Sequence, residues 1–237
     1  MISKNEALNI LKNDKFNNIN VTNFIENYPI NYIEKICDSL VIKGISDRPW
    51  VYIVSKSENE LKFIKKSLND KDKNFAIIEN WMIRVLTSGK KIKWILSAYR
   101  LFLPQEIILP APLYTISALK DADCSFIYES SDYKDFLSIE YVKERVTNGI
   151  SSCIRIDNTP IAWGMTQDDG AIGFLHVLPR YRRKGYGREI VLDLIQKVRK
   201  QGRLPFVHIE ENNEKSMNLS LSLGFKKDKI VNWFEIE

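Results

Sequence analysis

Five cations and two glycines crowd into one short stretch in the second half of the chain. Within nine residues that contain no acid, the cations are Arg180, Arg182, Arg183, Lys184 and Arg188. Gly185 and Gly187 stand among them, between a predicted strand and a predicted helix. The N-terminus of a helix attracts anions, and glycines let a phosphate come close to it. The stretch therefore predicts a site for a compact phosphate-bearing ligand, with a solvated basic turn as the alternative.

This stretch differs from two common nucleotide-binding motifs. No Lys-Ser or Lys-Thr follows the glycines, as a Walker loop requires, and the third glycine of a dinucleotide fingerprint is missing. Nucleic acid is also a poor match, because a net charge of +5 over 237 residues is too mild for the broad basic face that it needs. We expect no nucleic-acid partner.

The chain has two histidines, His176 and His208, and both lie on predicted strands. An imidazole has an unperturbed pKa of about 6.5, which suits a general base at neutral pH. For His208 the alternative is a buried structural role between aliphatic neighbours. For His176, the strand neighbours Ile172 and Phe174 suggest a place on the core face.

Cysteines and histidines are too few and too scattered for a metal centre. The three cysteines, Cys37, Cys124 and Cys153, form no C-x-x-C pair. The first twenty residues lack a secretory pattern, and no apolar run reaches the length of about 18 residues that a membrane span needs. We therefore expect a cytoplasmic protein with no metal site and no membrane contact.

The elements that would position these residues can be read from the second half of the chain. Turn residues such as Asp168, Asp169 and Gly170 separate strands that we expect to be antiparallel neighbours. Helices are predicted over residues 117–128, 138–147, 187–201 and 213–223, and strands over 152–155, 161–165, 171–177, 205–209, 225–227 and 231–236.

Residues 213–223 carry two conflicting signals. Met217, Leu219 and Leu221 alternate with polar residues, which taken alone indicates a strand. Asn213 is a good N-cap and Gly224 a good residue just beyond a helix. We therefore predict a helix.

The first half offers no catalytic cluster and no internal repeat. A composition of 44% hydrophobic and 27% charged residues is that of an ordinary globular protein. Pro104, Pro110 and Pro112 suggest a domain boundary near residue 112. Helices are predicted around residues 6–11, 32–40, 61–68 and 93–103, and strands around 51–54 and 75–78.

Two motifs resemble a known superfamily. Arg182-x-x-Gly185-x-Gly187 resembles the acyl-CoA pyrophosphate loop of the GNAT N-acetyltransferases. The downstream motif of that superfamily is similar to Asn213-Glu214-Lys215-Ser216 followed by Leu223-Gly224-Phe225. Two further motifs resemble the glycine N-acyltransferase-like branch of this superfamily. They are Pro160-x-x-Trp163 and Pro205-Phe206-Val207-His208.

The resemblance implies an α/β (α+β) fold. It consists of a GNAT acyltransferase domain over residues 113–237, with a mixed, mostly antiparallel sheet flanked by helices. A smaller α/β N-terminal domain over residues 1–112 precedes it.

The implied activity is the transfer of an acyl group from acetyl-CoA, or a related acyl-CoA, to an amine of a small molecule or peptide by direct attack. The coenzyme-binding positions would be Leu175, His176, Val177, Arg182, Arg183, Lys184, Gly185, Tyr186, Gly187, Arg188, Asn213 and Ser216. The alternative is a catalytically weak module that binds acyl-CoA and regulates a partner.

The catalytic positions depart from the superfamily. Its usual tyrosine, seven residues after the Asn, is Ser220 here, and the usual glutamate of the strand before the loop is Ala171. A third arrangement places a carboxylate five residues before the Asn, where this chain has His208. His208 is thus the predicted base. His176 is the second candidate for the base. Ser220 would bond coenzyme A or a water, unless it is simply part of a polar helix face.

Overall fold

The structure is a computed structural model that describes residues 1–131, 134 and 137–237, and the chain divides into two compact units. Unit 1 comprises Met1–Arg100, Glu210–Asn212 and Asp228–Glu237, and unit 2 comprises Leu101–Ile209 and Asn213–Lys227. The sequence suggested a boundary near residue 112, whereas the compact units change over at residue 100. None of the described helices is long and apolar enough to cross a membrane.

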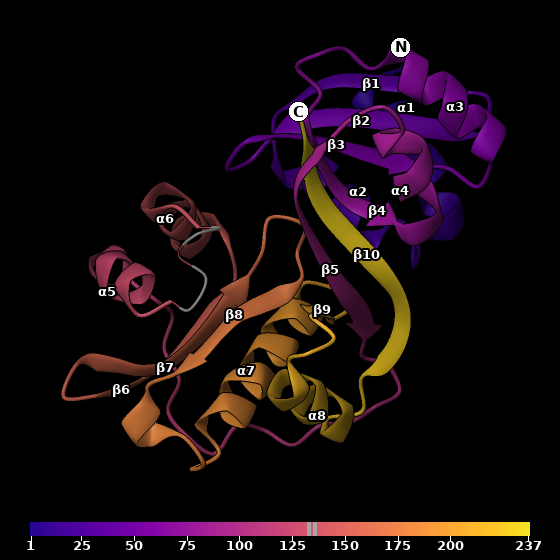
Figure 1. Cartoon of the computed structure of the whole chain (residues 1–237). Helices are drawn as coiled ribbons and strands as arrows, with labels where there is room; N and C mark the ends of the chain where they lie inside the picture. Colours follow the sequence, from indigo (N-terminus) through magenta and orange to yellow (C-terminus); the bar gives the residue numbers. More distant parts are fainter. Residues whose placement is uncertain (132–133, 135–136) are drawn as a thin grey trace. The chain divides into compact units, whose positions relative to one another are not determined.

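Unit 1 is built on a mixed sheet. Its elements are α1 (Lys4–Leu11), α2 (Ile19–Asn27), β1 (Ile30–Ile36), β2 (Ser39–Ile45), β3 (Pro49–Val54), α3 (Glu58–Ser67), β4 (Asn74–Glu79), α4 (Asn80–Thr87) and β5 (Ile92–Phe102). The last strand of the chain, β10 (Lys226–Ile236), joins this sheet, whose order is β1-β2-β3-β4-β10-β5 (Figure 1). Strands β3 and β4 are parallel, while β10 pairs with β4 in the antiparallel sense.

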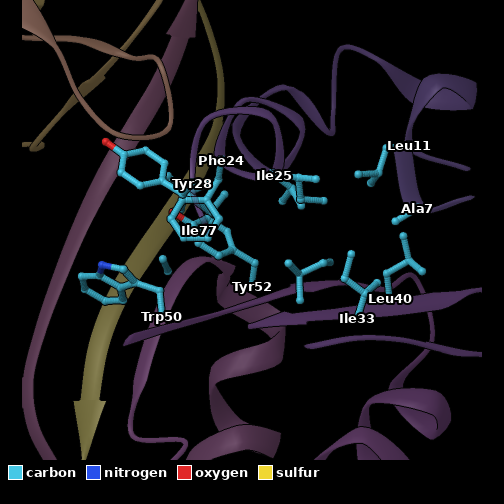
Figure 2. Packing of buried hydrophobic residues seen from close by; sticks show 14 residues of the cluster. Ala7, Leu11, Phe24, Ile25, Tyr28, Ile33, Leu40, Trp50, Tyr52 and Ile77 are labelled. Atoms are coloured by element: carbon cyan, nitrogen blue, oxygen red, sulfur yellow. The ribbon is translucent and has the colours of Figure 1, made fainter. Parts of the chain in front are cut away.

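Helices cover both faces of this sheet. On one face Leu11 of α1 and Phe24 of α2 pack against strand residues that include Tyr52, and all three are buried (Figure 2). On the other face Leu61 of α3 and Met82 of α4 belong to a second buried cluster. Unit 1 is therefore a three-layer structure with its own cores.

Unit 2 contains the predicted phosphate site. Its elements are α5 (Cys124–Glu129), α6 (Ile139–Asn148), β6 (Ser151–Ile156), β7 (Thr159–Thr166), β8 (Ile172–Val177), α7 (Tyr186–Lys200), β9 (Phe206–Ile209) and α8 (Glu214–Ser222). The sheet order is β9-β8-β7-β6, with β8 and β9 parallel and the other neighbours antiparallel. A mixed, mostly antiparallel sheet flanked by helices was predicted, and that fold class is confirmed.

The long helix α7 packs closely on β7 and β8 (Figure 1). Gly164 of β7 makes this approach possible, because a Cβ there would lie 2.9 Å from Cδ1 of Leu194 and 3.0 Å from Cγ2 of Ile190. The other face of the sheet carries α5 and α6, whose Ile127 and Val142 are buried in a cluster with strand residues. The packing fixes where α7 begins relative to the end of β8.

Two successive segments of the chain have the same order of helices and strands within the described residues. Two helices, three strands, a helix, a strand, a helix and a final strand run from α1 to β5, and the same series runs from α5 to β10. In each series the third and fourth strands are parallel, with Val51 opposite Phe75 and Ile172 opposite Val207. This repeat is not visible in the sequence, because the two series share topology rather than residue types.

Two predicted helices in unit 1 are strands. Residues 32–40 form the β1–β2 hairpin, in which Ile36 pairs with Ser39 across a two-residue turn. Residues 93–103 lie mostly in β5, where Lys93, Ile95 and Ser97 are exposed while their neighbours are partly or fully buried. This period of two was present in the sequence but was obscured by apolar residues on both faces.

Two further predictions in unit 2 need correction. Residues 117–128 were predicted to be one helix, but Ser117 forms a β-bridge with Cys153, and the α-helix begins at Cys124. The two strands predicted over residues 225–227 and 231–236 are one strand, β10. The predicted helix over residues 213–223 is confirmed as α8.

Candidate functional site

Strand β8 is interrupted by a bulge before it reaches the basic loop. Trp163 of β7 lies opposite His176, and Met165 lies opposite Gly173, so β8 has one residue more than β7 between these pairs. Phe174 lies in this bulge. Its φ of 51° is in the left-handed region, which non-glycine residues rarely adopt. On its other side β8 pairs with β9 in the parallel sense, with Ile172 opposite Val207. The part of β8 beyond the bulge, residues 175–177, is half-buried.

The loop from β8 to α7 ends in an uncapped helix N-terminus. Gly185 is the N-cap residue of α7, with a φ of 83° and no side-chain cap. The first N–H groups of a helix have no partners within the helix, and the macrodipole makes this end positive. A Cβ on Gly187 would meet Cγ2 of Val177 at 3.5 Å, an ordinary contact. The fold therefore tolerates a side chain at position 187, and a need for glycine there would come from a ligand.

The predicted cations are exposed around this N-terminus. Arg182, Arg183, Lys184 and Arg188 are all exposed. Nε of Arg182 donates a hydrogen bond to the carbonyl of Val177 at 2.9 Å, so this guanidinium also ties the loop to the end of β8. The structure brings together the residues of the predicted phosphate loop.

An aromatic cluster lies beside the loop. Tyr186, the first residue of α7, contacts Tyr114 and Tyr181 edge to face, at centroid distances of 5.0 and 6.4 Å. Glu189, buried in the first turn of α7, accepts a hydrogen bond from the backbone N–H of Leu113. This bond attaches the segment after the prolines to the start of α7.

His208 lies on β9 with its side chain 4% exposed. Its Nδ1 is 3.7 Å from Oδ2 of Asp169, whose side chain is 2% exposed. The ring of Phe206 packs edge to face against the imidazole at 5.6 Å. His208 therefore has a carboxylate on its Nδ1 side. The sequence predicted Asp169 only as a turn residue, and no local signal marks its approach to His208.

His176 has different surroundings. Its ring stacks on the buried indole of Trp163, with centroids 4.7 Å apart and planes 21° apart. Trp163 in turn contacts Phe126 edge to face. His176 is thus part of an aromatic stack on β8, which favours a packing role for its side chain.

The predicted site residues of α8 have different roles in the helix: one caps its N-terminus and another has a buried hydroxyl. Asn213 caps α8, because its Oδ1 accepts the backbone N–H of Ser216 at 3.1 Å. Ser220 is buried in the last half of the helix. Ala171, at the position where the superfamily carries a glutamate, is fully buried.

The cysteines of unit 2 do not offer a nucleophile. Cys124 and Cys153 are buried and free. Burial raises the pKa of the Cys153 thiol to about 11 and also raises that of Cys124. Both are thiols rather than thiolates at neutral pH, and the thiolate is the reactive form. The described residues contain no cluster of three or more His, Cys, Asp or Glu that could hold a metal ion.

Comparisons with known proteins agree with this geometry. A family model described as FR47-like protein matches residues 153–234, which include β8, the basic loop, α7 and α8. A Drosophila protein of known structure has a TM-score of 0.80 at 18% identity, over 100% of this chain and 97% of that chain.

Two bacterial structures carry the superfamily name. A GCN5-related N-acetyltransferase from Kribbella flavida has a TM-score of 0.61 at 13% identity, covering 93% of this chain and 94% of its own. A GCN5-related N-acetyltransferase-like protein from Streptococcus suis has a TM-score of 0.57 at 13% identity, covering 99% and 98%. The chain has the fold of the GNAT acetyltransferases.

Proposed function

We propose that the protein is an N-acyltransferase that uses acetyl-CoA, or a related acyl-CoA, as donor and an amine of a small molecule or peptide as acceptor. The observation that carries this proposal is the uncapped N-terminus of α7, which lies in a cationic loop directly after a bulged strand. The GNAT fold and the FR47-like match support it.

The loop has the chemistry that the pyrophosphate of coenzyme A requires. Backbone N–H groups of residues 183–187 would bond the phosphate oxygens, and the exposed cations Arg183, Lys184 and Arg188 would balance their charge. Gly185 supplies the positive φ that turns the chain into α7. Gly187 leaves room for the phosphate to approach the helix.

The pantetheine arm would run along β8 beyond the bulge. Backbone groups of Leu175, His176 and Val177 would pair with its amides, because this part of β8 lies past the point where β8 is in register with β9. Asn213 and Ser216 fix the start of α8, and their predicted contact with the coenzyme is part of the proposal.

The reaction is direct attack by the amine on the thioester carbon. A C–N bond forms, the C–S bond breaks, and the thiol of coenzyme A leaves after a tetrahedral intermediate. A backbone N–H of β8 would stabilise the oxyanion. His208 would take the amine proton, directly or through a water, and Ser220 or a water that it holds would return a proton to the sulfur.

The acceptor class rests on the resemblance to the glycine N-acyltransferase-like branch, which makes small amino compounds the first candidates. A second function is favoured by the burial of His208, whose side chain is only 4% exposed. A module that binds acyl-CoA but transfers the acyl group poorly would show such a buried histidine and Ala171 in place of an acid.

Binding and turnover separate these functions. Titration calorimetry with coenzyme A and acetyl-CoA tests the donor site, and a screen of glycine, other amino acids, polyamines and peptides, read by thiol release, tests transfer. Saturable binding with thiol release on an amine supports the enzyme. Binding without turnover on any amine supports the regulatory module, and no binding of either ligand contradicts both.

A further inference from the structure

We propose that Asp169 is a positioning residue that holds the imidazole of His208 in one orientation and one tautomer. Its carboxylate would keep the Nδ1–H of His208 turned toward Oδ2 and leave the lone pair of Nε2 for the proton of the attacking amine. The catalytic consequence rests on the proposed function, whereas the orientation of the ring can be tested without it.

The two side chains meet between neighbouring elements of unit 2. Asp169 lies in the connection from β7 to β8, and His208 lies on β9, which is parallel to β8. Oδ2 of Asp169 is 3.7 Å from Nδ1 of His208, and both side chains are almost fully buried. A buried carboxylate is stable when a cation or hydrogen-bond donors face it. The separation of 3.7 Å is an ion-pair distance and exceeds that of a direct hydrogen bond, so the imidazole N–H would move closer to Oδ2 or bond it through a water.

The connection holds Asp169 in place from several sides. Oδ1 of Asp169 accepts the backbone N–H of Ala171 at 3.0 Å, and its own N–H donates to Oδ1 of Asp168 at 3.0 Å. From α6, Arg145 donates to the carbonyl of Gln167 at 3.0 Å. These bonds fix the turn, so that the second carboxylate oxygen is the one presented to His208.

A fixed carboxylate on one side of an imidazole has two effects. A neutral histidine has two tautomers, and an acceptor beside Nδ1 selects the one that carries the proton there. When Nε2 then takes a proton, the negative carboxylate stabilises the imidazolium that forms, as the aspartate does in a Ser-His-Asp triad. The low exposure of both groups strengthens this interaction.

The orientation is tested by NMR on the full chain. Two histidines make the spectrum simple, and His176 serves as an internal reference. In a long-range proton–nitrogen spectrum, recorded at a pH where both rings are neutral, His208 is expected as the Nδ1–H tautomer. A spectrum that shows the Nε2–H tautomer for His208 overturns the inference.

The catalytic role is tested by a double-mutant cycle with acetyl-CoA and the amine of the screen that gives the fastest thiol release. Asp169→Asn keeps the shape of the side chain and removes its charge. We expect kcat to fall about 100-fold, a typical loss for an impaired general base, while KM for acetyl-CoA changes less than about twofold. In the His208→Ala background, Asp169→Asn should add less than about a twofold loss.

Asp157→Asn is the control, since it removes the same charge from an exposed position in the turn between β6 and β7, at the other end of the sheet order of unit 2 from β9. It should leave kcat within about twofold of the parent protein. If Asp169→Asn keeps the parent kcat, or if its loss multiplies with that of His208→Ala, the positioning role is wrong. If the parent protein releases no thiol with any amine, the proposed function fails, and the tautomer alone decides whether Asp169 orients His208.

Discussion

The same junction occurs once in each unit, and the two copies differ in their chemistry. In unit 1, β3 ends at Val54 and α3 begins at Glu58, so three residues connect them. In unit 2, β8 ends at Val177 and α7 begins at Tyr186, and the eight residues between them carry the cationic loop. Both junctions join a third strand to the helix that precedes a parallel fourth strand.

The helix start in unit 1 is closed to an anion. Oγ of Ser57 accepts the backbone N–H of Glu60 at 3.3 Å and caps α3. Glu60 in turn accepts the hydroxyl of Ser39 at 2.6 Å and the N–H of Asp38 at 3.2 Å. With Glu58 also in the first turn, negative side chains already occupy the positive end of α3.

This difference shows that the repeated topology does not by itself make a phosphate site. The site requires a loop long enough to curl around the helix start, a glycine in place of a capping side chain, and cations in place of acids. Unit 2 has all three features at the start of α7, and unit 1 has none of them at the start of α3. We therefore expect one coenzyme site in the chain, at α7.

The largest expected effect comes from reversing two charges of the loop. Arg183→Glu with Lys184→Glu replaces two exposed cations by acids and should weaken coenzyme A binding at least about 100-fold, since each charge-assisted bond contributes about 1.5–3 kcal/mol. Equilibrium dialysis at fixed ionic strength measures the loss.

The matched control reverses two charges in unit 1. Lys65 and Lys66 lie in the last turn of α3, and their replacement by Glu changes the net charge by the same amount. This control should bind coenzyme A within about threefold of the parent protein. Equal losses in the two variants would mean that net charge, rather than the loop, determines binding.

The second effect concerns the unfolding free energy and its dependence on pH. Asp123 is buried and bonded by both terminal nitrogens of Arg155, and these hydrogen bonds lower its pKa. In unit 1, Glu6 and Glu58 also have a lowered pKa, but they are exposed. Asp123→Asn should therefore cost about 2 kcal/mol of unfolding free energy at neutral pH.

The pH dependence of this loss has a definite sign. A carboxyl whose pKa is lower in the folded state stabilises the fold above its unfolded pKa of about 3.9, and the contribution disappears as the pH falls further. The unfolding free energies of the parent protein and of Asp123→Asn, measured with urea, should thus converge below about pH 4. If the difference in unfolding free energy between the two proteins stays constant down to pH 3, the pairing of Asp123 with Arg155 is not its cause.

The third effect sharpens the role of Gly187. Because a Cβ there makes only an ordinary contact with Val177, Gly187→Ala should fold normally and melt at the same or a higher temperature. Coenzyme A affinity should nevertheless fall about tenfold, or ~1.4 kcal/mol, because the methyl group occupies the approach of the phosphate. Unchanged affinity would show that the ligand does not come close to this turn.

The smallest effect is expected at the capped helix. Ser57→Ala removes the N-cap of α3 and should lower the unfolding free energy by about 1 kcal/mol. Coenzyme A affinity should be unaffected, because α3 is not expected to bind it. Weaker binding of coenzyme A by this variant would contradict the assignment of the site to α7.

The sequence predicted the part of the chain that carries the site better than the rest. Gly185, the cations around it and the aliphatic residues of α7 at helical spacing are local signals, and each of them marks the same junction. Residues 93–103, by contrast, were predicted to be a helix, although pairing in a sheet determines that most of them form β5. Partners that are distant in the chain decide such strands, and a single sequence does not show them.

The same reason explains what was missed at the site. The bulge at Phe174 depends on how β8 pairs with β7, and the approach of Asp169 to His208 depends on the parallel pairing of β8 and β9. Neither feature has a local signal. The residue type of His208 suggested a base, but its carboxylate neighbour required the fold.

Of the two topologically equivalent junctions, only the one at α7 is expected to bind coenzyme A. Calorimetric titration of coenzyme A into the full chain tests it most directly, because the stoichiometry counts the sites. We predict saturable heat with one site per chain, which the Arg183→Glu and Lys184→Glu changes remove. Two sites per chain, or no saturable binding by the parent protein, would show that α7 does not form a single coenzyme A site.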